Sequence, residues 1–132
     1  MSKRTWLGAI AGGVVGWLGS FLLHGVVMGA TYIRYDEVFT QEQANPMWFL
    51  LTAFLVSLAA AYVFDRTRDK WPAGLSGGLC FGALVGAIIG FTNFYWPLVF
   101  LGFPYYMAWC WLGIDVIVYS LMGAVFTIFI KP

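Results

Sequence analysis

The polar side chains with the greatest capacity for chemistry lie inside long apolar segments of the sequence. His24, Asn93 and Asp115 each interrupt such a segment, and Tyr119 follows Asp115 by about one helical turn. An acidic residue at the centre of a membrane-spanning helix costs roughly 2.5–3.5 kcal/mol to insert and marks a functional site by default. We therefore predict an intramembrane polar pocket of His24, Asn93, Asp115 and Tyr119. In a functional interpretation of this pocket, Asp115 and His24 share a proton or bind a ligand.

The depth of these residues supports a common location. At 1.5 Å per helical residue, Asp115 lies roughly 15 Å and His24 roughly 12 Å from the outer ends of their helices. Asn93 lies nearer the outer end of its own helix. All three side chains can therefore meet in the outer half of one helix bundle.

A structural role for Asp115 is the alternative, and we favour it. In this interpretation Asp115 is neutral, or it is hydrogen-bonded to Tyr119, Tyr62 or His24, and it fixes the register of the helices. The apolar segments contain no second acid and no Lys or Arg that would form an ion-coupled pair with Asp115.

No catalytic or metal site can be assembled from these residues. A catalytic zinc needs three protein ligands, and His24 is the single histidine. The sequence has no CxxC, HExxH, P-loop or GxSxG pattern. We therefore predict that the chain is not an enzyme and holds no metal.

The residues before His24 raise one cofactor hypothesis. Gly16, Ser20, His24 and Met28 recur every four residues, which leaves a flat shelf beside the imidazole. This pattern resembles the small-x-x-x-His arrangement of light-harvesting polypeptides, in which histidine binds the magnesium of a chlorophyll. The resemblance covers one helix and implies His24 as a bacteriochlorophyll ligand. Otherwise no cofactor is predicted, and a lipid or a quinone is the other candidate occupant.

The surrounding composition requires a lipid environment. The 132 residues are 61% hydrophobic and 10% charged, whereas soluble domains average about 25% charged residues. The net charge of +1 gives no basic surface for nucleic acid. Four apolar segments are long enough to span a bilayer. We predict one all-α transmembrane domain, residues 1–132, with helices at about 6–30, 47–64, 74–97 and 105–130.

Charges and aromatic residues predict the topology. Six basic residues fall on one side of a four-span arrangement: Lys3, Arg4, Arg66, Arg68, Lys70 and Lys131. Arg34 falls on the other side, in the loop 32–46 with Asp36, Glu37 and Glu42. Because basic loops stay cytoplasmic, we predict a bacterial inner-membrane protein with both termini in the cytoplasm. Aromatic residues near the predicted helix ends form interfacial belts, namely Trp6, Trp48, Trp71, Tyr32, Trp96 and Tyr105.

Two rows of glycine predict close helix packing. Glycine recurs every fourth residue in the first and third apolar segments, at Gly8, Gly12 and Gly16 and at Gly74, Gly78, Gly82, Gly86 and Gly90. Small residues at this spacing let helix backbones approach each other in lipid. We predict glycine-zipper packing, with the third helix against the first as the favoured arrangement. A lipid, a pigment tail or a second protomer is the alternative occupant of the third helix's groove.

The two glycine rows also match each other. GAIAGGVVGW at 8–17 aligns with GALVGAIIGF at 82–91 at an offset of 74 residues. Either the chain is a duplicated helix hairpin with parallel repeats, or the match arises by chance from abundant glycine and alanine; we weigh these two interpretations equally.

Two membrane-protein families share features with the chain. The segment GAIIGFTNF resembles the G-F-T-T-F segment of small four-helix fluoride channels, although the one-sided charge and the absence of asparagine in the second helix differ from that family. More broadly, the chain resembles bacterial four-helix membrane proteins of unknown function, which implies no activity. We predict a non-catalytic accessory or structural subunit of a larger respiratory or photosynthetic complex or a homo-oligomer, with other subunits, itself and membrane lipid as partners. A small transporter or ion channel that uses the polar pocket is one alternative, and a tetrapyrrole- or lipid-binding subunit is another.

Overall fold

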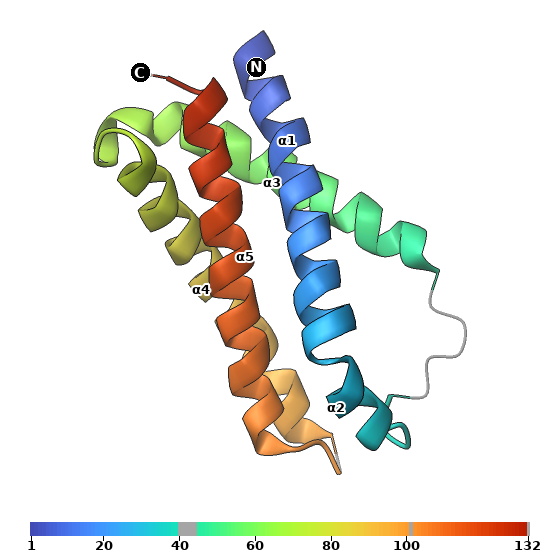
Figure 1. Cartoon of the computed structure of the whole chain (residues 1–132). Coiled ribbons are helices and arrows are strands. Elements are labelled where there is room, and N and C mark those ends of the chain that lie inside the picture. The colour runs from blue at the N-terminus through green and yellow to red at the C-terminus, as the bar shows by residue number, and fades with distance from the viewer. Residues whose placement is uncertain (40–44, 101, 132) are drawn as a thin grey trace.

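The computed structural model describes residues 1–39, 45–100 and 102–131, and its regular structure is helical. Within these ranges, four helices are long and apolar enough to cross a membrane, which confirms the prediction of a multi-pass all-α protein (Figure 1). These helices are α1 (Lys3–Ser20) with the π-helix η1 (Phe21–Val27), α3 (Pro46–Thr67) with the 3₁₀ turn η2 (Arg68–Lys70), α4 (Leu75–Val99) and α5 (Tyr105–Phe129). A short helix, α2 (Gly29–Arg34), follows η1.

The helix ends follow local sequence signals. Ser2 caps α1 and Asn45 caps α3, each accepting a hydrogen bond from a backbone N–H of the first turn, at 3.1 and 3.0 Å. Pro104 precedes α5, where a missing N–H costs little. Gly74 precedes α4 at a φ of +70°, and a Cβ placed there would meet nothing within 4 Å. Gly74 therefore permits the turn into α4 and does not continue the packing row predicted for it.

The first predicted helix is not a continuous α-helix over residues 6–30. Around His24 the chain forms η1, in which the Met28 N–H donates to the Leu23 carbonyl oxygen at 3.0 Å, five residues back. Such a wider turn is rare and occurs frequently at functional sites. It also breaks the four-residue spacing, so His24 and Ser20 do not share one straight row.

The four long helices do not form a compact square bundle. α5 lies between α1 and α4, and α3 packs mainly on α1 (Figure 1). Near the termini, Phe64 of α3 meets Phe81 of α4 with ring centroids 5.0 Å apart. α3 then diverges from the other helices toward its own start at Pro46. The outer halves of α3 and α4 are therefore separated.

The glycine row of α4 faces α5, not α1 as we predicted. Gly78, Gly82 and Gly86 lie so close to α5 that added Cβ atoms would collide with its backbone carbonyl oxygens, those of Gly123, Tyr119 and Asp115. The row of α1 also faces α5, but through side chains. A Cβ on Gly16 would lie 2.6 Å from the Met122 methyl carbon, and one on Gly8 would lie 3.2 Å from the Ile130 side chain.

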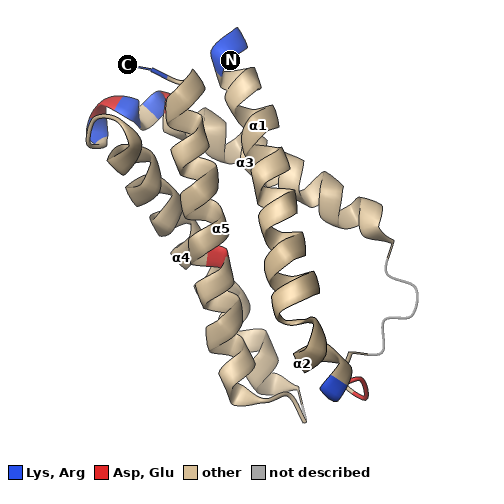
Figure 2. Cartoon of the chain, viewed as in Figure 1, with Lys and Arg blue, Asp and Glu red and all other residues tan. Residues whose placement is uncertain are grey.

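Charge is confined almost entirely to the two ends of the molecule. Lys and Arg gather at the end that carries both termini, and Arg34 lies at the opposite end (Figure 2). Asp115 is the one acidic residue drawn in the middle of a long helix among the described residues. Glu42, predicted to face the outside, lies outside the described residues.

Candidate functional site

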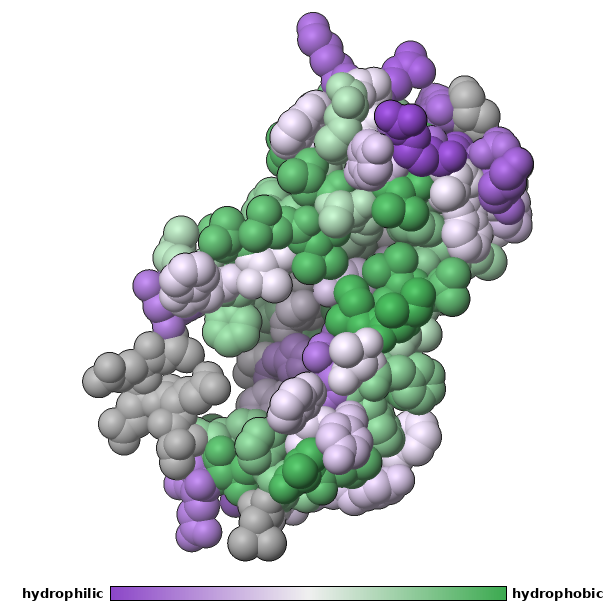
Figure 3. Space-filling model, turned by 180° about the vertical axis from the view of Figure 1, so that it is seen from behind, coloured by the Kyte–Doolittle hydropathy of each residue, from purple (hydrophilic) through white to green (hydrophobic). Residues whose placement is uncertain are grey.

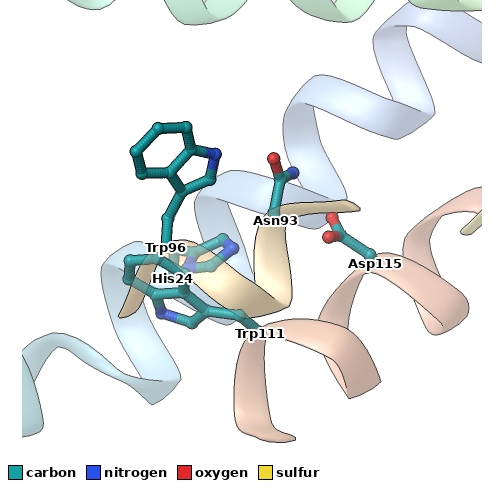
Figure 4. A pocket seen from close by; sticks show the side chains of 5 residues that line it. All are labelled: His24, Asn93, Trp96, Trp111 and Asp115. Carbon is teal, nitrogen blue, oxygen red and sulfur yellow. The ribbon is translucent and has the colours of Figure 1, made fainter. Parts of the chain in front are cut away.

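The structure places three of the predicted polar residues around one pocket. His24 of η1, Asn93 of α4 and Asp115 of α5 line it together with Trp96 and Trp111 (Figure 4). The sequence spacing explains this arrangement, because Asn93 and Trp96 are three residues apart on α4, and Trp111 and Asp115 are four residues apart on α5. Residues at these spacings lie on the same face of a helix.

The pocket is small and open to one side. Its volume is about 220 Å³, below the roughly 300–1,000 Å³ of pockets that enclose drug-sized ligands. The face of the molecule seen in Figure 3 is hollowed beside α3, and hydrophilic side chains lie within that hollow. Among the described residues the lining comes from η1, α4 and α5, and the outer half of α3 stands apart from α4.

A hydrogen-bonded chain fixes the histidine side of the pocket. The Trp111 indole N–H donates to the Tyr32 hydroxyl at 2.8 Å, and that hydroxyl lies 2.5 Å from His24 Nδ1. Indole can only donate, so the Tyr32 hydroxyl accepts from Trp111. The second bond joins this hydroxyl to His24 Nδ1, and which of the two groups donates depends on the histidine tautomer.

Tyr32 is suited to this role. Burial raises the pKa of its hydroxyl above the ordinary value of 10.0, and the hydrogen bond from Trp111 opposes that shift. The hydroxyl therefore stays protonated at neutral pH and keeps its hydrogen bonds to Trp111 and His24.

Aromatic rings hold Trp111 in position. The rings of Phe103 and His24 lie 5.2 and 6.2 Å from it, both nearly perpendicular to the indole. Phe39 lies 6.3 Å away and also packs on Tyr32, at 4.9 Å. Edge-to-face packing of this kind orients rings, so the Trp111 side of the pocket is preorganised.

Asp115 has no partner among the described residues. It receives no hydrogen bond and forms no ion pair within residues 1–39, 45–100 and 102–131. Thus the predicted bonds to Tyr119, Tyr62 and His24 are not formed in the described chain. Figure 4 shows the carboxyl group directed from α5 toward α4, where Asn93 lies.

The glycines of α4 determine where Asp115 sits. A Cβ on Gly86 would lie 2.6 Å from the Asp115 carbonyl oxygen, and one on Gly90 would lie 3.4 Å from the Asp115 Cβ atom. The absence of side chains at these two positions lets α5 approach α4 at the level of the pocket. The packing row and the polar residue therefore belong to one local arrangement.

Tyr119 lies apart from the pocket, contrary to the predicted set of four residues. It packs against the hydrophobic cluster that contains Phe64, Phe81 and Phe126, nearer the termini. Sequence reasoning missed Trp111 and assigned Tyr32 and Trp96 to interfacial belts. The spacing of the two tryptophans could have indicated them, because Trp111 lies four residues before Asp115 and Trp96 lies three residues after Asn93. Nothing in the local sequence indicated Tyr32.

The described residues contain no group of three or more His, Cys, Asp and Glu side chains that could hold a metal ion. Comparison with protein-family models, with curated proteins and with solved structures gave no match. The function must therefore be argued from the pocket itself.

Proposed function

We propose that this protein binds the polar group of a small amphipathic molecule within the membrane. The observation that carries this proposal is the Asp115 carboxyl group, which has no hydrogen-bond or ion-pair partner among the described residues and lines a pocket formed by η1, α4 and α5. Asp115 is half-buried, and a polar group loses free energy when it leaves water without forming a hydrogen bond. A ligand that pairs with Asp115 offsets this cost.

The pocket's size supports partial burial of the ligand. A volume of about 220 Å³ holds a polar head and leaves an apolar remainder outside. That remainder lies in lipid, beside the exposed apolar surface of the chain. The role that we propose for this pocket is binding and not catalysis.

The experiment is a ligand titration of the purified protein in lipid nanodiscs. The panel consists of benzyltrimethylammonium, its neutral isostere neopentylbenzene, phenylmethanesulfonate and decylubiquinone, each followed by calorimetry. Asn93→Trp fills the pocket from an exposed position, and Tyr95→Trp places the same indole side chain two residues away, outside the lining. We expect at least one probe to bind the parent and Tyr95→Trp but not Asn93→Trp. Absence of saturable binding by every probe overturns the proposal.

A second candidate function is that of a subunit in a larger membrane assembly. It is favoured by the first turn of α3, where the consecutive residues Met47, Trp48 and Phe49 are 61, 67 and 64% exposed. Three consecutive exposed residues point to different sides of a helix, so the described chain leaves most of this turn uncovered. Copurification of a stable partner in mild detergent, lost in Trp48→Ala, supports this candidate; a monomer that purifies alone contradicts it.

We further propose a location and an assembly principle. The clustering of basic residues at the end that carries both termini supports a bacterial inner-membrane protein with cytoplasmic termini. The close approach of α4 to α5 at Gly78, Gly82 and Gly86 supports glycine-zipper packing between them. Parallel glycine-rich helices on either side of α5 support an internal duplication of the α1 and α4 segments.

A further inference from the structure

Resting on the proposed function, we infer that the polar group held in the pocket is a cation of the quaternary ammonium or protonated amine class. The inference begins with the charges that reach the pocket. Asp115 is the acidic residue of its lining, and no Lys or Arg lines it. A carboxylate in a low-dielectric site requires a positive partner, and the described chain supplies none.

Histidine forms no ion pair with Asp115 among the described residues. Its Nδ1 is hydrogen-bonded to the Tyr32 hydroxyl instead, and that hydroxyl also accepts from Trp111. An anionic ligand would therefore face Asp115 with no Lys or Arg in the lining to compensate its charge. A ligand with a positive charge is the complementary choice.

The aromatic lining selects the same class of ligand. Trp96 and Trp111 both line the pocket, and indole is the ring that attracts cations most strongly across its face. Trp96 is 61% exposed, so its ring is available rather than enclosed by the protein core. A carboxylate beside two indoles binds an alkylammonium through charge and through its polarised methyl groups, without a hydrogen-bond donor on the nitrogen.

The shape of the site determines the rest of the ligand. The pocket is too small for a large molecule, and it opens beside the divergent part of α3. The ligand is therefore a lipophilic cation, with a compact ammonium head in the pocket and an aromatic or alkyl body in the bilayer. Its entry through lipid would not require passage through the packed α4–α5 interface.

The test compares the four probes on the parent protein and on variants of two residues. We expect benzyltrimethylammonium to bind the parent at least about tenfold more tightly than neopentylbenzene, because the two differ only in charge. Asp115→Asn should weaken this cation by more than about tenfold, whereas Asp115→Glu should retain it. Trp96→Ala should weaken it by about 2- to 30-fold, and Trp96→Phe by less. Asp69→Asn, which alters an exposed carboxyl group far from the pocket, is the matched control and should bind as the parent does.

Each result is decisive. Binding of decylubiquinone, neopentylbenzene or phenylmethanesulfonate without binding of the cation overturns this inference and leaves the proposed function standing. Cation binding that is equal in the parent and in Asp115→Asn also overturns it. Failure of every probe overturns both the inference and the proposed function. If Asp115→Asn does not fold, Asp115→Glu and the two Trp96 variants carry the test, and unchanged affinity in Trp96→Ala then counts against the inference.

Discussion

Replacing Gly82 and Gly86 by alanine tests whether backbone contact holds α4 against α5. A Cβ on Gly86 would lie 2.6 Å from the Asp115 carbonyl oxygen, and ordinary contact begins at 3.4 Å. The two helices must therefore separate locally by at least 0.8 Å, and they must separate further at Gly82, where the Tyr119 carbonyl oxygen lies closer. Overpacking of this kind costs about 1–3 kcal/mol.

The matched control is Gly113→Ala. Gly113 also lies within a long helix, but a Cβ there would meet nothing within 4 Å. Gly82→Ala and Gly113→Ala gain the same helix propensity, roughly 0.5–1 kcal/mol. The difference between their free energies of unfolding therefore isolates the cost of overpacking. We expect Gly82→Ala to be about 1–3 kcal/mol less stable than Gly113→Ala. The assay is equilibrium unfolding in mixed micelles of mild detergent and dodecyl sulfate, followed by tryptophan fluorescence. Equal free energies of unfolding for Gly82→Ala and Gly113→Ala would refute the reasoning.

Three further predictions concern other parts of the chain. Ser57→Ala should cost about 1 kcal/mol of stability because its buried hydroxyl donates to a backbone carbonyl of α1 at 2.7 Å; Ser120→Ala, whose hydroxyl bonds within its own helix, should cost less in the same unfolding assay. Tyr32→Phe should cost about 1–3 kcal/mol because it leaves an indole N–H and an imidazole nitrogen unpaired, and an unchanged midpoint would contradict the assigned network. In a cysteine-free background, Glu37→Cys should react with impermeant maleimide on intact cells, and Lys70→Cys only after permeabilisation; equal labelling would indicate dual insertion.

The sequence was sufficient to predict the spans and the polar trio of the pocket. Hydropathy and length determine which segments cross a bilayer, and these depend on local composition alone. Depth along a helix follows from residue counting, which is why His24, Asn93 and Asp115 were expected at one level. Tyr119 was assigned to the pocket because it lies about one helical turn after Asp115. In the structure, Tyr119 packs against the hydrophobic cluster that contains Phe64 and Phe126.

Partner choice between helices was not predictable in the same way. The third helix was expected against the first, because both carry glycine rows, but both rows face α5. A row of small residues indicates that something approaches closely and does not identify it. The π-helix at Phe21–Val27 was also missed, since the local sequence around His24 differs little from an ordinary apolar helix.

The two glycine rows show how one motif serves two kinds of contact. On α4, glycine admits the α5 backbone itself, and the facing residue at one level is another glycine, Gly123. On α1, glycine admits α5 side chains, and a Cβ on Gly12 would lie 3.1 Å from the Met122 side chain. α5 therefore meets α4 mainly through its backbone and α1 through its side chains. Because Asp115 lies on the close-packed side, next to Gly86, the carboxyl group is held by backbone contact rather than by flexible side chains. This rigidity positions Asp115 toward the pocket without any hydrogen bond from the described chain, and it leaves the carboxyl group free to pair with a ligand.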